Sequence, residues 1–545
     1  LYIGAGPFAI EHVSFNGPLY DPLNPAPPQV AGNNLLRISP VGGGSRVSRF
    51  TGRHLRFTGA QNGIYILQTE DVVIDDIFTD RNWGGGWVVD PYYDSAGVRT
   101  QHIYINNARS RGAGYYCGSI PGIQRPSPLL SAAPRDIVIT NVRCDGSGFI
   151  GAKYCYDLTG SAVDEVIFEG SGQNCYNGGM ESKGGGVIPQ VIPAAFRNIK
   201  IDFTYYSNID SNQEGVALPY ESSAPNPDER RNYLVHAYVT YNAPTAWQPT
   251  WYYNVGDVAT NGGNTYRVTQ SGISAASGGP TGMAGANDGT VVWQFVEATP
   301  TVPAGIVACE VEAITDAEIH CSAQGTAIGY NLLFRGSSDK TIRRVDLYFD
   351  GTVQRSCLSD NSFSAGTANG LRLIQWGCHT SGLSGASAID LGGAANTYTN
   401  FEIVGGSFID DNSGFVFRNS GATITGKITG APHMVGYDGV VYLSGGATTL
   451  TWGGGGLVET THTNVAAAPF YSATAGIGGT ITVLGEIGVN NAALSGIGSW
   501  GNAPGGTLTV NGRFVNGFLS AAPAGSVHCS WGDMFRSIQP GNGGP

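Results

Sequence analysis

The sequence predicts an all-β fold, a parallel β-helix, from three observations: a degenerate repeat, Gly-rich turns between short strands, and no helical periodicity. Apolar or small residues recur at positions i, i+2 and i+5, and five successive units begin at Val72, Ile103, Ile137, Val166 and Ile199. These starts lie 31, 34, 29 and 33 residues apart. A repeat of this length is typical of a solenoid, because stacked coils bury a continuous apolar face that one coil cannot bury alone.

Each unit continues through a turn into a second short strand. The i, i+2, i+5 pattern is found in Leu55/Phe57/Ala60, Val72/Ile74/Ile77, Ile103/Ile105/Ala108, Ile137/Ile139/Val142, Val166/Phe168/Ser171 and Ile199/Ile201/Thr204, and again in Ala317/Ile319/Ser322, Leu371/Leu373/Trp376 and Phe401/Ile403/Gly406. Second strands are expected at Gly86–Val89, Gly114–Cys117 and Gly148–Ile150. Asp360 and Asp410 follow at turn positions, where Asp caps the backbone locally, so both are expected to be structural.

Changes in composition along the chain divide it into five parts. Residues 1–44 form an N-terminal lead-in or cap, 45–242 the first part of the β-helix, and 304–444 its second part. Between them, residues 243–303 are an inserted β module with Pro-containing linkers. From 445 to 545 the strands become rich in Thr, Gly and Ala, which predicts a C-terminal β-rich domain that caps the stack or joins subunits.

Composition excludes several classes of function. The 545 residues include 82 Gly, only 13% are charged, and the net charge is −12. No basic run is present, which argues against nucleic acid as a partner. No apolar run of about 18 residues is present either, so we expect no membrane insertion. The N-terminus has neither an initiator Met nor the features of a signal peptide, and we expect a fragment or processed product.

The nine Cys are scattered, with no metal-binding spacing. Cys117, Cys144, Cys155 and Cys175 fall in or near expected strands and turns. We interpret them as buried reduced thiols, with disulfides as the lesser alternative, and we expect neither a zinc site nor a cofactor. Reduced thiols favour assembly in the cytosol.

The inserted segment has its own aromatic pattern. It contains W-x3-W-Y-Y-x2-G-D-V from Trp247, then N-T-Y-R-V and D-G-T-V-V-W. It resembles small carbohydrate-binding modules of the chitin-binding type and similar inserts in phage tail proteins. The resemblance implies that Trp251, Tyr253 and Trp293 bind sugar, since flat rings stack on the apolar faces of sugars. The alternative is that Trp251, Tyr266 and Trp293 form the module's own core.

The candidate catalytic groups lie on the second strands of the coils. In Met180–Lys183, alternation turns Met180 and Ser182 inward and Glu181 and Lys183 outward. Lys153 is expected on the same outward column one coil earlier, with Tyr154, Tyr156 and Asp157 just beyond it. Because stacked coils lie about 4.8 Å apart, residues of neighbouring coils can form one site. Residues expected to contact the substrate are Tyr115, Tyr116, Arg111 and Trp87.

Two reactions fit these residues. In glycoside hydrolysis, Glu181 suits the base or nucleophile because a nearby cation favours its charged form, and Asp157 is then the acid. Carboxyls on adjacent coils would be about 5 Å apart and those two coils apart about 9–10 Å, which spans the retaining and inverting geometries. In β-elimination at a uronic acid, Lys153, Lys183, Arg111 and Tyr115 would neutralise the substrate and abstract the proton. Hydrolysis is slightly favoured.

The chain is expected to combine a Gly-rich β-helix, long lateral loops, a sugar-binding-like insert and a β-rich C-terminal part. This architecture resembles the bacteriophage tailspike depolymerases. The resemblance is architectural, covers roughly residues 45–545 and carries over no catalytic residue. It implies a right-handed helix, a homotrimer, a virion location with attachment through a preceding domain, and endo-cleavage of bacterial O-antigen or capsule. A non-catalytic receptor-binding adhesin and a secreted cell-wall-degrading or pectin-degrading enzyme are the alternatives.

Overall fold

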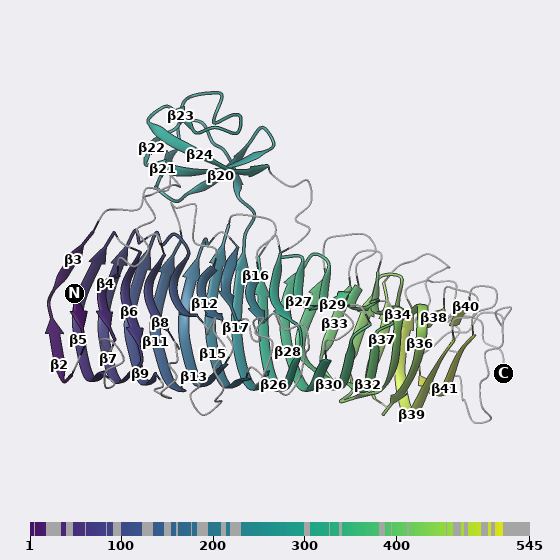
Figure 1. The fold of residues 1–545 in the computed structure, drawn as a ribbon. Coiled ribbons are helices and arrows are strands. Elements are labelled where there is room, and N and C mark those ends of the chain that lie inside the picture. The colour runs from purple at the N-terminus through teal and green to yellow at the C-terminus, as the bar shows by residue number, and fades with distance from the viewer. Residues whose placement is uncertain are drawn as a thin grey trace, which may run out of the picture. The chain divides into compact units, whose positions relative to one another are not determined.

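The structure is a computed structural model. It describes residues 1–4, 6–17, 34–39, 47–59, 61–82, 84–90, 100–121, 135–146, 154–159, 162–175, 177–182, 195–208, 214–218, 230–298, 306–325, 328–336, 341–363, 365–380, 387–393, 395–410, 414–453, 455–461, 470–472, 478–491, 500–502 and 507–515. The chain divides into two compact units, Leu1–Val307 and Ala308–Pro545. Outside residues 243–303, the strands within each unit pair in parallel with strands one coil away, so the predicted all-β parallel β-helix is confirmed (Figure 1).

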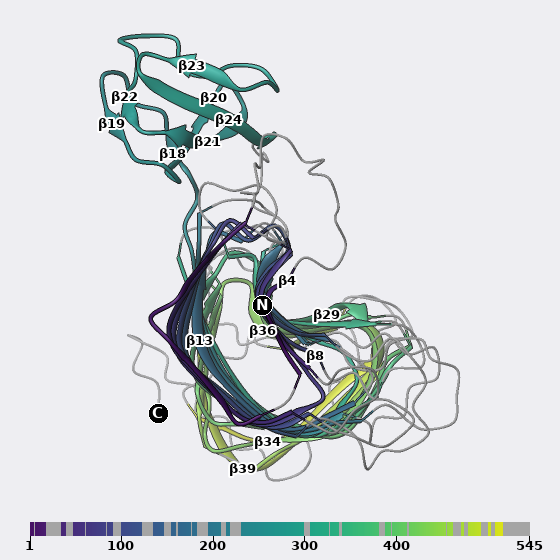
Figure 2. The ribbon, with the colours of Figure 1, turned by 60° about the vertical axis from the view of Figure 1, so that its left-hand side comes forward.

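The first unit has a long and a short strand in each coil. The long strands are β5 (Val47–Thr58), β7 (Thr69–Asp80), β9 (Gln101–Arg111), β11 (Arg135–Asp145), β13 (Ala162–Gln173), β15 (Ala195–Ser207) and β17 (Arg230–Tyr241). The short strands are β4 (Asn34–Ile38), β6 (Asn62–Leu67), β8 (Gly85–Asp90), β10 (Tyr116–Pro121), β12 (Tyr154–Thr159), β14 (Gly178–Glu181) and β16 (Glu214–Leu218). In each set the strands pair in sequence order, and Figure 2 shows successive coils of this unit overlying one another.

The core follows the predicted columns. Val72, Ile103, Ile137, Val166 and Ile199 lie opposite one another on β7, β9, β11, β13 and β15, and all are buried. The next inward column contains Ile74, Ile105, Ile139, Phe168 and Ile201. Burying one such aliphatic side chain contributes roughly 1.5–3 kcal/mol, so these columns are the main stabilising element of the unit.

Polar residues in the left-handed region explain the i, i+2, i+5 spacing. Asp71, His102, Asp136, Glu165 and Asn198 directly precede the first core residue of each unit, with φ of 55, 53, 53, 55 and 57°. Asp76, Asn107 and Asn141 precede the i+5 residue, with φ of 56, 53 and 52°. A left-handed residue interrupts the alternation of a strand, so the next inward side chain comes at i+5 instead of i+4. Asn and Asp tolerate this conformation better than most residues.

Where that second left-handed residue is missing, the predicted core residue is wrong. In β13 and β15 alternation continues, so Gly170 and Phe203 take the inward positions. Ser171 is half-buried and Thr204 exposed. In the second unit, Cys321 is likewise buried in place of Ser322.

The lead-in strands belong to the stack. β1 (Tyr2–Ile3) pairs in parallel with β4, and β2 (Phe8–Glu11) and β3 (Ser14–Asn16) pair in parallel with β5. The described residues before 45, for which the sequence predicted a lead-in or cap, are therefore coil strands.

The second unit repeats the coil design. Its strands are β25 (Val307–Val311), which begins at the boundary, β26 (Ile314–Gln324), β27 (Tyr330–Gly336), β28 (Thr341–Val353), β29 (Ser356–Phe363), β30 (Thr367–Thr380), β31 (Ser387–Leu391), β32 (Thr397–Val404), β33 (Ser407–Asp410), β34 (Phe415–Thr429), β35 (His433–Gly436), β36 (Gly439–Trp452), β37 (Leu457–Thr460), β38 (Phe470–Ser472), β39 (Gly478–Asn491), β40 (Trp500–Asn502) and β41 (Thr507–Val515). Parallel pairing continues from β36 to β39 and from β39 to β41. A separate C-terminal domain starting at 445 is therefore wrong for the described residues, which extend the coils to Val515.

The insert forms its own small sheets. β18 (Thr245–Ala246), β20 (Val258–Asn261), β21 (Asn264–Gln270), β24 (Val291–Ala298) and β23 (Ala286–Asp288) form a five-stranded sheet in that order, and β19 (Tyr252–Tyr253) pairs with β22 (Gly272–Ile273). The core contains Tyr253, Tyr266 and Trp293. The buried Asp288 accepts hydrogen bonds from the indole N–H of Trp247, at 2.7 Å, and of Trp293, at 3.1 Å.

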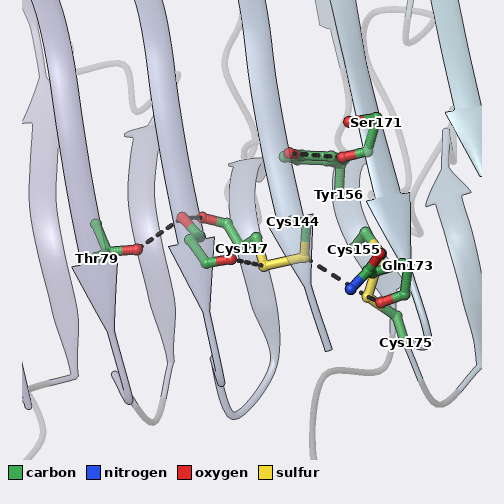
Figure 3. The surroundings of a disulfide bond; sticks show 9 residues. Thr79, Cys117, Cys144, Cys155, Tyr156, Ser171, Gln173 and Cys175 are labelled. Carbon is green, nitrogen blue, oxygen red and sulfur yellow. Dashed lines mark hydrogen bonds between the residues drawn. A yellow bond between two sulfur atoms is a disulfide. The ribbon is translucent and has the colours of Figure 1, made fainter. Parts of the chain in front are cut away.

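Eight cysteines form four disulfides: Cys117–Cys144, Cys155–Cys175, Cys309–Cys321 and Cys357–Cys378. The expectation of reduced thiols is therefore wrong for these residues. The Cα atoms of the pairs lie 5.5 to 6.3 Å apart, within the range that a disulfide spans. The first two pairs are neighbours in the interior of the first unit, where Cys144 Sγ lies 3.6 Å from Cys175 Sγ (Figure 3). Cys529 lies outside the described residues.

Candidate active site

The short strands of the first unit present a polar column away from the core. Gly118, Tyr156, Met180 and Val216 lie opposite one another on β10, β12, β14 and β16, and Tyr156, Met180 and Val216 are buried in the core. The residues one position on, Ser119, Asp157, Glu181 and Ala217, form the adjacent column. Because side chains alternate along a strand, this column faces outward.

Two carboxyl groups meet in this column. Asp157 of β12 lies directly opposite Glu181 of β14, and the two residues are only 4% and 3% exposed. Adjacent strands are about 4.8 Å apart, so the two carboxyl groups are close enough to act on one bond. Sequence reasoning had selected both residues, and the fold brings them together.

A serine supports the first carboxylate. Ser119 of β10, buried like its neighbours, donates a hydrogen bond from Oγ to Asp157 Oδ2 at 3.1 Å. A donor of this kind favours the ionised form of the carboxyl group that accepts from it. This role was not predicted from the sequence, because a single Ser in a strand carries no signal of its own.

Polar contacts flank the pair along the same strands. The Tyr154 hydroxyl donates to Glu214 Oε2 at 3.0 Å, across the strand that carries Glu181. The buried Arg230 donates to the carbonyl oxygens of Leu218, at 2.8 Å, and Ser182, at 3.2 Å. These bonds fix the backbone at the ends of β14 and β16, directly after Glu181.

The aromatic and basic residues that were predicted to contact the substrate differ in their exposure and in their polar partners. Tyr115 is exposed and Tyr116 half-buried, at the start of β10. Arg111, at the end of β9, is held by the buried Asp80 through its Nε at 3.2 Å and its Nη2 at 3.0 Å. Hydrogen bonding to Asp80, which outweighs burial, raises the pKa of Arg111.

Trp87 occupies the core instead of the surface. It is 1% exposed, and its ring lies 6.2 Å from that of Tyr156. A Cβ added at Gly118 would come within 2.0 Å of the Trp87 ring, so glycine there makes room for the indole. Contact of Trp87 with a substrate is therefore contradicted.

Within the insert, the core alternative applies to two of the three aromatic residues. Tyr253 and Trp293 are buried and pack with their rings 4.7 Å apart. Only Trp251, 61% exposed, is placed to meet a ligand. Beside it, Tyr252 is 57% exposed, a residue that the sequence analysis did not select as a binding residue. Lys153 and Lys183 lie outside the described residues.

The second unit has two kinds of carboxylate. Asp360 is buried and accepts from the Gly393 N–H at 2.9 Å, from Asn396 at 2.7 Å and from the Tyr398 hydroxyl at 2.7 Å. Burial raises the pKa of Asp360, although these donors oppose the shift. These contacts indicate a structural role for Asp360, but it lies within β29 and not at the predicted turn.

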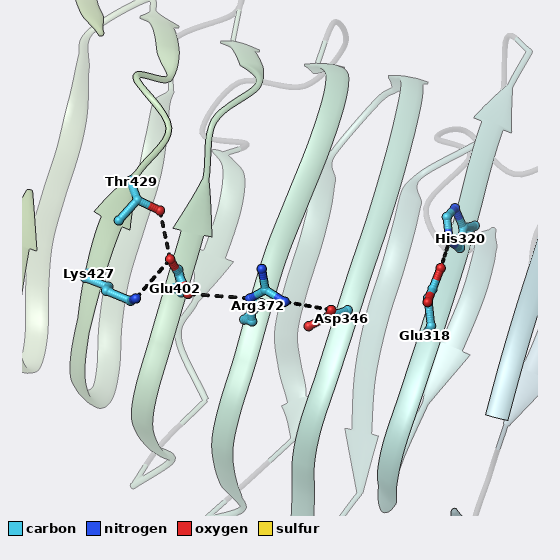
Figure 4. Close-up of polar contacts among 7 residues, drawn as sticks. All are labelled: Glu318, His320, Asp346, Arg372, Glu402, Lys427 and Thr429. Atoms are coloured by element: carbon cyan, nitrogen blue, oxygen red, sulfur yellow. Dashed lines mark hydrogen bonds and ion pairs between the residues drawn. The ribbon is translucent and has the colours of Figure 1, made fainter. Parts of the chain in front are cut away.

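The other kind forms a charge ladder across five coils. Glu318, Asp346, Arg372, Glu402 and Lys427 lie opposite one another on β26, β28, β30, β32 and β34. Arg372 contacts Asp346 at 2.8 Å and Glu402 at 3.5 Å, and Lys427 contacts Glu402 at 3.2 Å (Figure 4). Opposite charges alternate in the centre of the ladder, which suits a solvated structural face better than a catalytic site.

Potential metal ligands were compared across the described parts of both units. The grouping of three found there is Cys144, Cys155 and Cys175, and all three sulfurs belong to disulfides. A sulfur in a disulfide is not the thiolate that binds metals. No helix in the described part of the chain is long and apolar enough to cross a membrane.

No protein-family model and no curated protein matches the sequence. Solved structures that resemble the chain are catalytic domains of a GH87 alpha-1,3-glucanase, two in complex with nigerose and one with tetrasaccharides. Sequence identity is 11%, 11% and 9%, with TM-scores of 0.27, 0.26 and 0.19. The match covers 79% of this chain and 63% of each glucanase chain, less than two thirds of its length. At such TM-scores the likeness carries no weight for activity, and the fold assignment depends on the strand pairing above.

Proposed function

We propose that the chain is an endo-acting polysaccharide hydrolase in which Asp157 and Glu181 cleave the glycosidic bond. The observation that supports this most is the register that sets these two buried carboxyl groups opposite each other on an outward face. A separation of about 5 Å belongs to the retaining class, whereas inverting enzymes need room for a water molecule between the carboxyls.

The burial of Asp157 and Glu181 suggests which of them is the nucleophile and which is the acid. Two carboxylates so close in a buried place repel each other, so the pair is expected to hold one proton near neutral pH. The hydrogen bond from Ser119 favours ionised Asp157. Asp157 is then the nucleophile and Glu181 the acid. This reverses the sequence-based roles, which depended on Lys183.

The reaction then has two steps. Asp157 attacks the anomeric carbon while Glu181 gives its proton to the departing glycosidic oxygen, so a glycosyl ester forms as the bond to the leaving sugar breaks. Glu181, now ionised, takes a proton from water, whose oxygen attacks the same carbon and releases Asp157. Each carboxyl group thereby regains its starting state.

Elimination has less support among the described residues. Of its four proposed participants, Lys153 and Lys183 lie outside the described part of the chain. The guanidinium of Arg111 is paired with Asp80, and such pairing leaves less of its charge for a substrate carboxylate. Tyr115 is exposed. Elimination thus remains a lesser alternative to hydrolysis.

As the biological setting, we propose a phage tailspike that acts on bacterial O-antigen or capsule at the cell surface. Support comes from the architectural resemblance: a long parallel β-helix carrying an insert with the exposed Trp251. A homotrimer, a virion location and attachment through a preceding domain belong to the same proposal. Sedimentation of the purified chain tests the trimer, and a monomer at micromolar concentration would contradict it.

Substitution of each carboxyl group tests the hydrolase directly. Asp157→Asn and Glu181→Gln should each slow cleavage of surface polysaccharide by roughly 10²- to 10⁴-fold while binding persists. Glu169→Gln is the matched control, since this exposed carboxylate only pairs with Lys200 at 3.3 Å. Full activity in either variant would refute the site. Binding without cleavage by the unaltered chain would favour the adhesin alternative.

A further inference from the structure

The second unit has an outward column of its own, on its short strands. Leu358, Ile389, Phe417 and Val441 lie opposite one another on β29, β31, β34 and β36 and are buried. The residues one position on, Ser359, Asp390, Arg418 and Tyr442, therefore face away from the core. Four consecutive coils thus carry a hydroxyl, a carboxylate, a guanidinium and a phenol in one line, of which Ser359 and Asp390 are buried and Arg418 and Tyr442 half-buried.

An aromatic pair completes this line. The ring of Phe415, at the start of β34, stacks on that of Tyr442 with centroids 4.4 Å apart and an interplanar angle of 29°. Both residues are half-buried, so the pair keeps part of its surface exposed to solvent. Beside it, Arg418 Nε lies 3.9 Å from Asp390 Oδ1. The guanidinium is therefore held over the sheet, and its charge is balanced locally.

We propose that Tyr442, Phe415, Arg418 and Asp390 form a second polysaccharide-binding site, which takes an uncharged pyranose ring. A flat aromatic surface stacks on the apolar face of a sugar, and the half-buried guanidinium next to it, which lies beside the buried Asp390, can donate to ring hydroxyls. Ser359 is fully buried, and the described part of this column contains one carboxylate, Asp390. An acid–base pair is missing from the column, so the site binds and does not cleave.

Charge argues for a sugar over a nucleobase, the other common partner of such rings. A nucleic acid would bring a phosphate backbone to a chain with net charge −12, and Asp390 cancels the charge of Arg418 at the site itself. A neutral sugar is not repelled by the negative charge of the chain.

The inference depends on the proposed hydrolase. Kinetics on a long and a short substrate distinguish a failure of the second site from a failure of the hydrolase. The probes are purified O-antigen polysaccharide from a panel of Gram-negative strains and short products of its partial digestion that the enzyme still cleaves. For Tyr442→Ala we expect KM for the polymer to rise roughly tenfold with kcat unchanged, and kinetics on the short products to stay as they were. Tyr442→Phe should keep the low KM, since the ring is retained.

Tyr348→Ala is the matched control. This tyrosine lies on β28 of the same unit and stacks on His320 at 4.1 Å, but it belongs to the other set of strands. Polymer KM unchanged in Tyr442→Ala, or raised equally in Tyr348→Ala, would overturn the second site while the hydrolase stands. A chain that shortens no polysaccharide on the panel would instead overturn the proposed function, and this inference with it.

Discussion

In the proposed mechanism, Ser119 is the residue that favours the ionised form of Asp157. Its hydroxyl donates to Asp157 at 3.1 Å in a buried place, where a hydrogen bond to a charged group contributes about 1.5–3 kcal/mol. Each 1.36 kcal/mol corresponds to one pH unit of titration. The role of Asp157 as nucleophile therefore depends on a neighbour one coil away.

Replacement of this serine tests that role. Ser119→Ala removes a donor to the ionised form, so the acidic limb of the pH–activity profile should move up by about 1–2 pH units. Ser119→Thr keeps the hydroxyl and should restore the limb. An unmoved acidic limb with reduced activity would mean that Ser119 is only structural and that Asp157 is not the ionised partner.

Glu402 gives a second prediction, on stability. Burial alone would raise its pKa, but hydrogen bonds from Thr429 and Lys427 and the charges of Lys427 and Arg372 lower it below the ordinary 4.5. A depressed pKa means that the ionised group stabilises the fold above pH 4.5 and that this contribution is lost as the pH falls through the lower folded value.

Glu402→Gln should therefore lower the free energy of unfolding at neutral pH and flatten its decline below pH 4.5. Urea unfolding at several pH values measures this effect. Glu318→Gln, at the exposed end of the ladder, is the control that should change little. Equal curves for the two variants would show that the ladder does not stabilise Glu402.

The sequence pattern identified the candidate carboxyl pair, Asp157 and Glu181, but it did not place the neighbouring residues correctly. Glu181 was selected within the expected second strand Met180–Lys183, and Asp157 just beyond the one expected at Gly148–Ile150. Trp87 was misplaced because a short strand does not reveal which of its two faces is inward, and a neighbouring glycine, Gly118, gave the indole room inside. Whether an aromatic residue binds or packs depends on contacts from other coils, which the local sequence does not contain.

At the scale of the element, a long strand is defined by a left-handed polar residue and by the buried core residues that follow it. The polar residue before each first core position occupies the left-handed region, as at Asp71 and Asn198. Its recurrence was visible in the sequence, but Glu165 and Asn198 follow the same rule, so it does not correct the positions of Ser171 and Thr204. The missing signal was the absence of a second left-handed residue in β13 and β15.

The neighbouring disulfides give a prediction for the first unit. Removing one by the double change Cys155→Ala and Cys175→Ala should cost about 2–4 kcal/mol of unfolding free energy, since the unfolded chain gains freedom. Thiol labelling under non-reducing, denaturing conditions checks the pairing first. Labelling of all nine cysteines would contradict the four disulfides, and an unchanged unfolding midpoint would contradict their contribution.

The pairing of cysteines could not be predicted because it joins residues of different strands. Cys117 and Cys144 are 27 residues apart, and only the stacking of coils brings their Cα atoms to 5.7 Å. The same dependence on three-dimensional register applies to Asp157 and Glu181. Spacing along the chain limits such pairs but does not identify them.

At the scale of the whole molecule, parallel coils account for both units. The change of composition near residue 445 suggested a new domain, yet the described residues continue the coils through β39 and β41. Strands with small side chains such as Thr and Gly can form a coil as well as strands with large side chains, where the interior of the coil leaves less volume to fill. The change of composition at the insert coincides with described strands that form two small sheets of their own.

The most direct test of the central claim is the stereochemistry of cleavage. The purified chain is incubated with O-antigen polysaccharide from a panel of Gram-negative strains, and product length, ultraviolet absorbance and the anomeric form of the first-formed reducing ends are followed by chromatography and NMR. The account predicts shorter chains, no absorbance from unsaturated uronic acid, and retained configuration, because Asp157 and Glu181 lie on adjacent strands. Inverted configuration, or an unsaturated product, would contradict it.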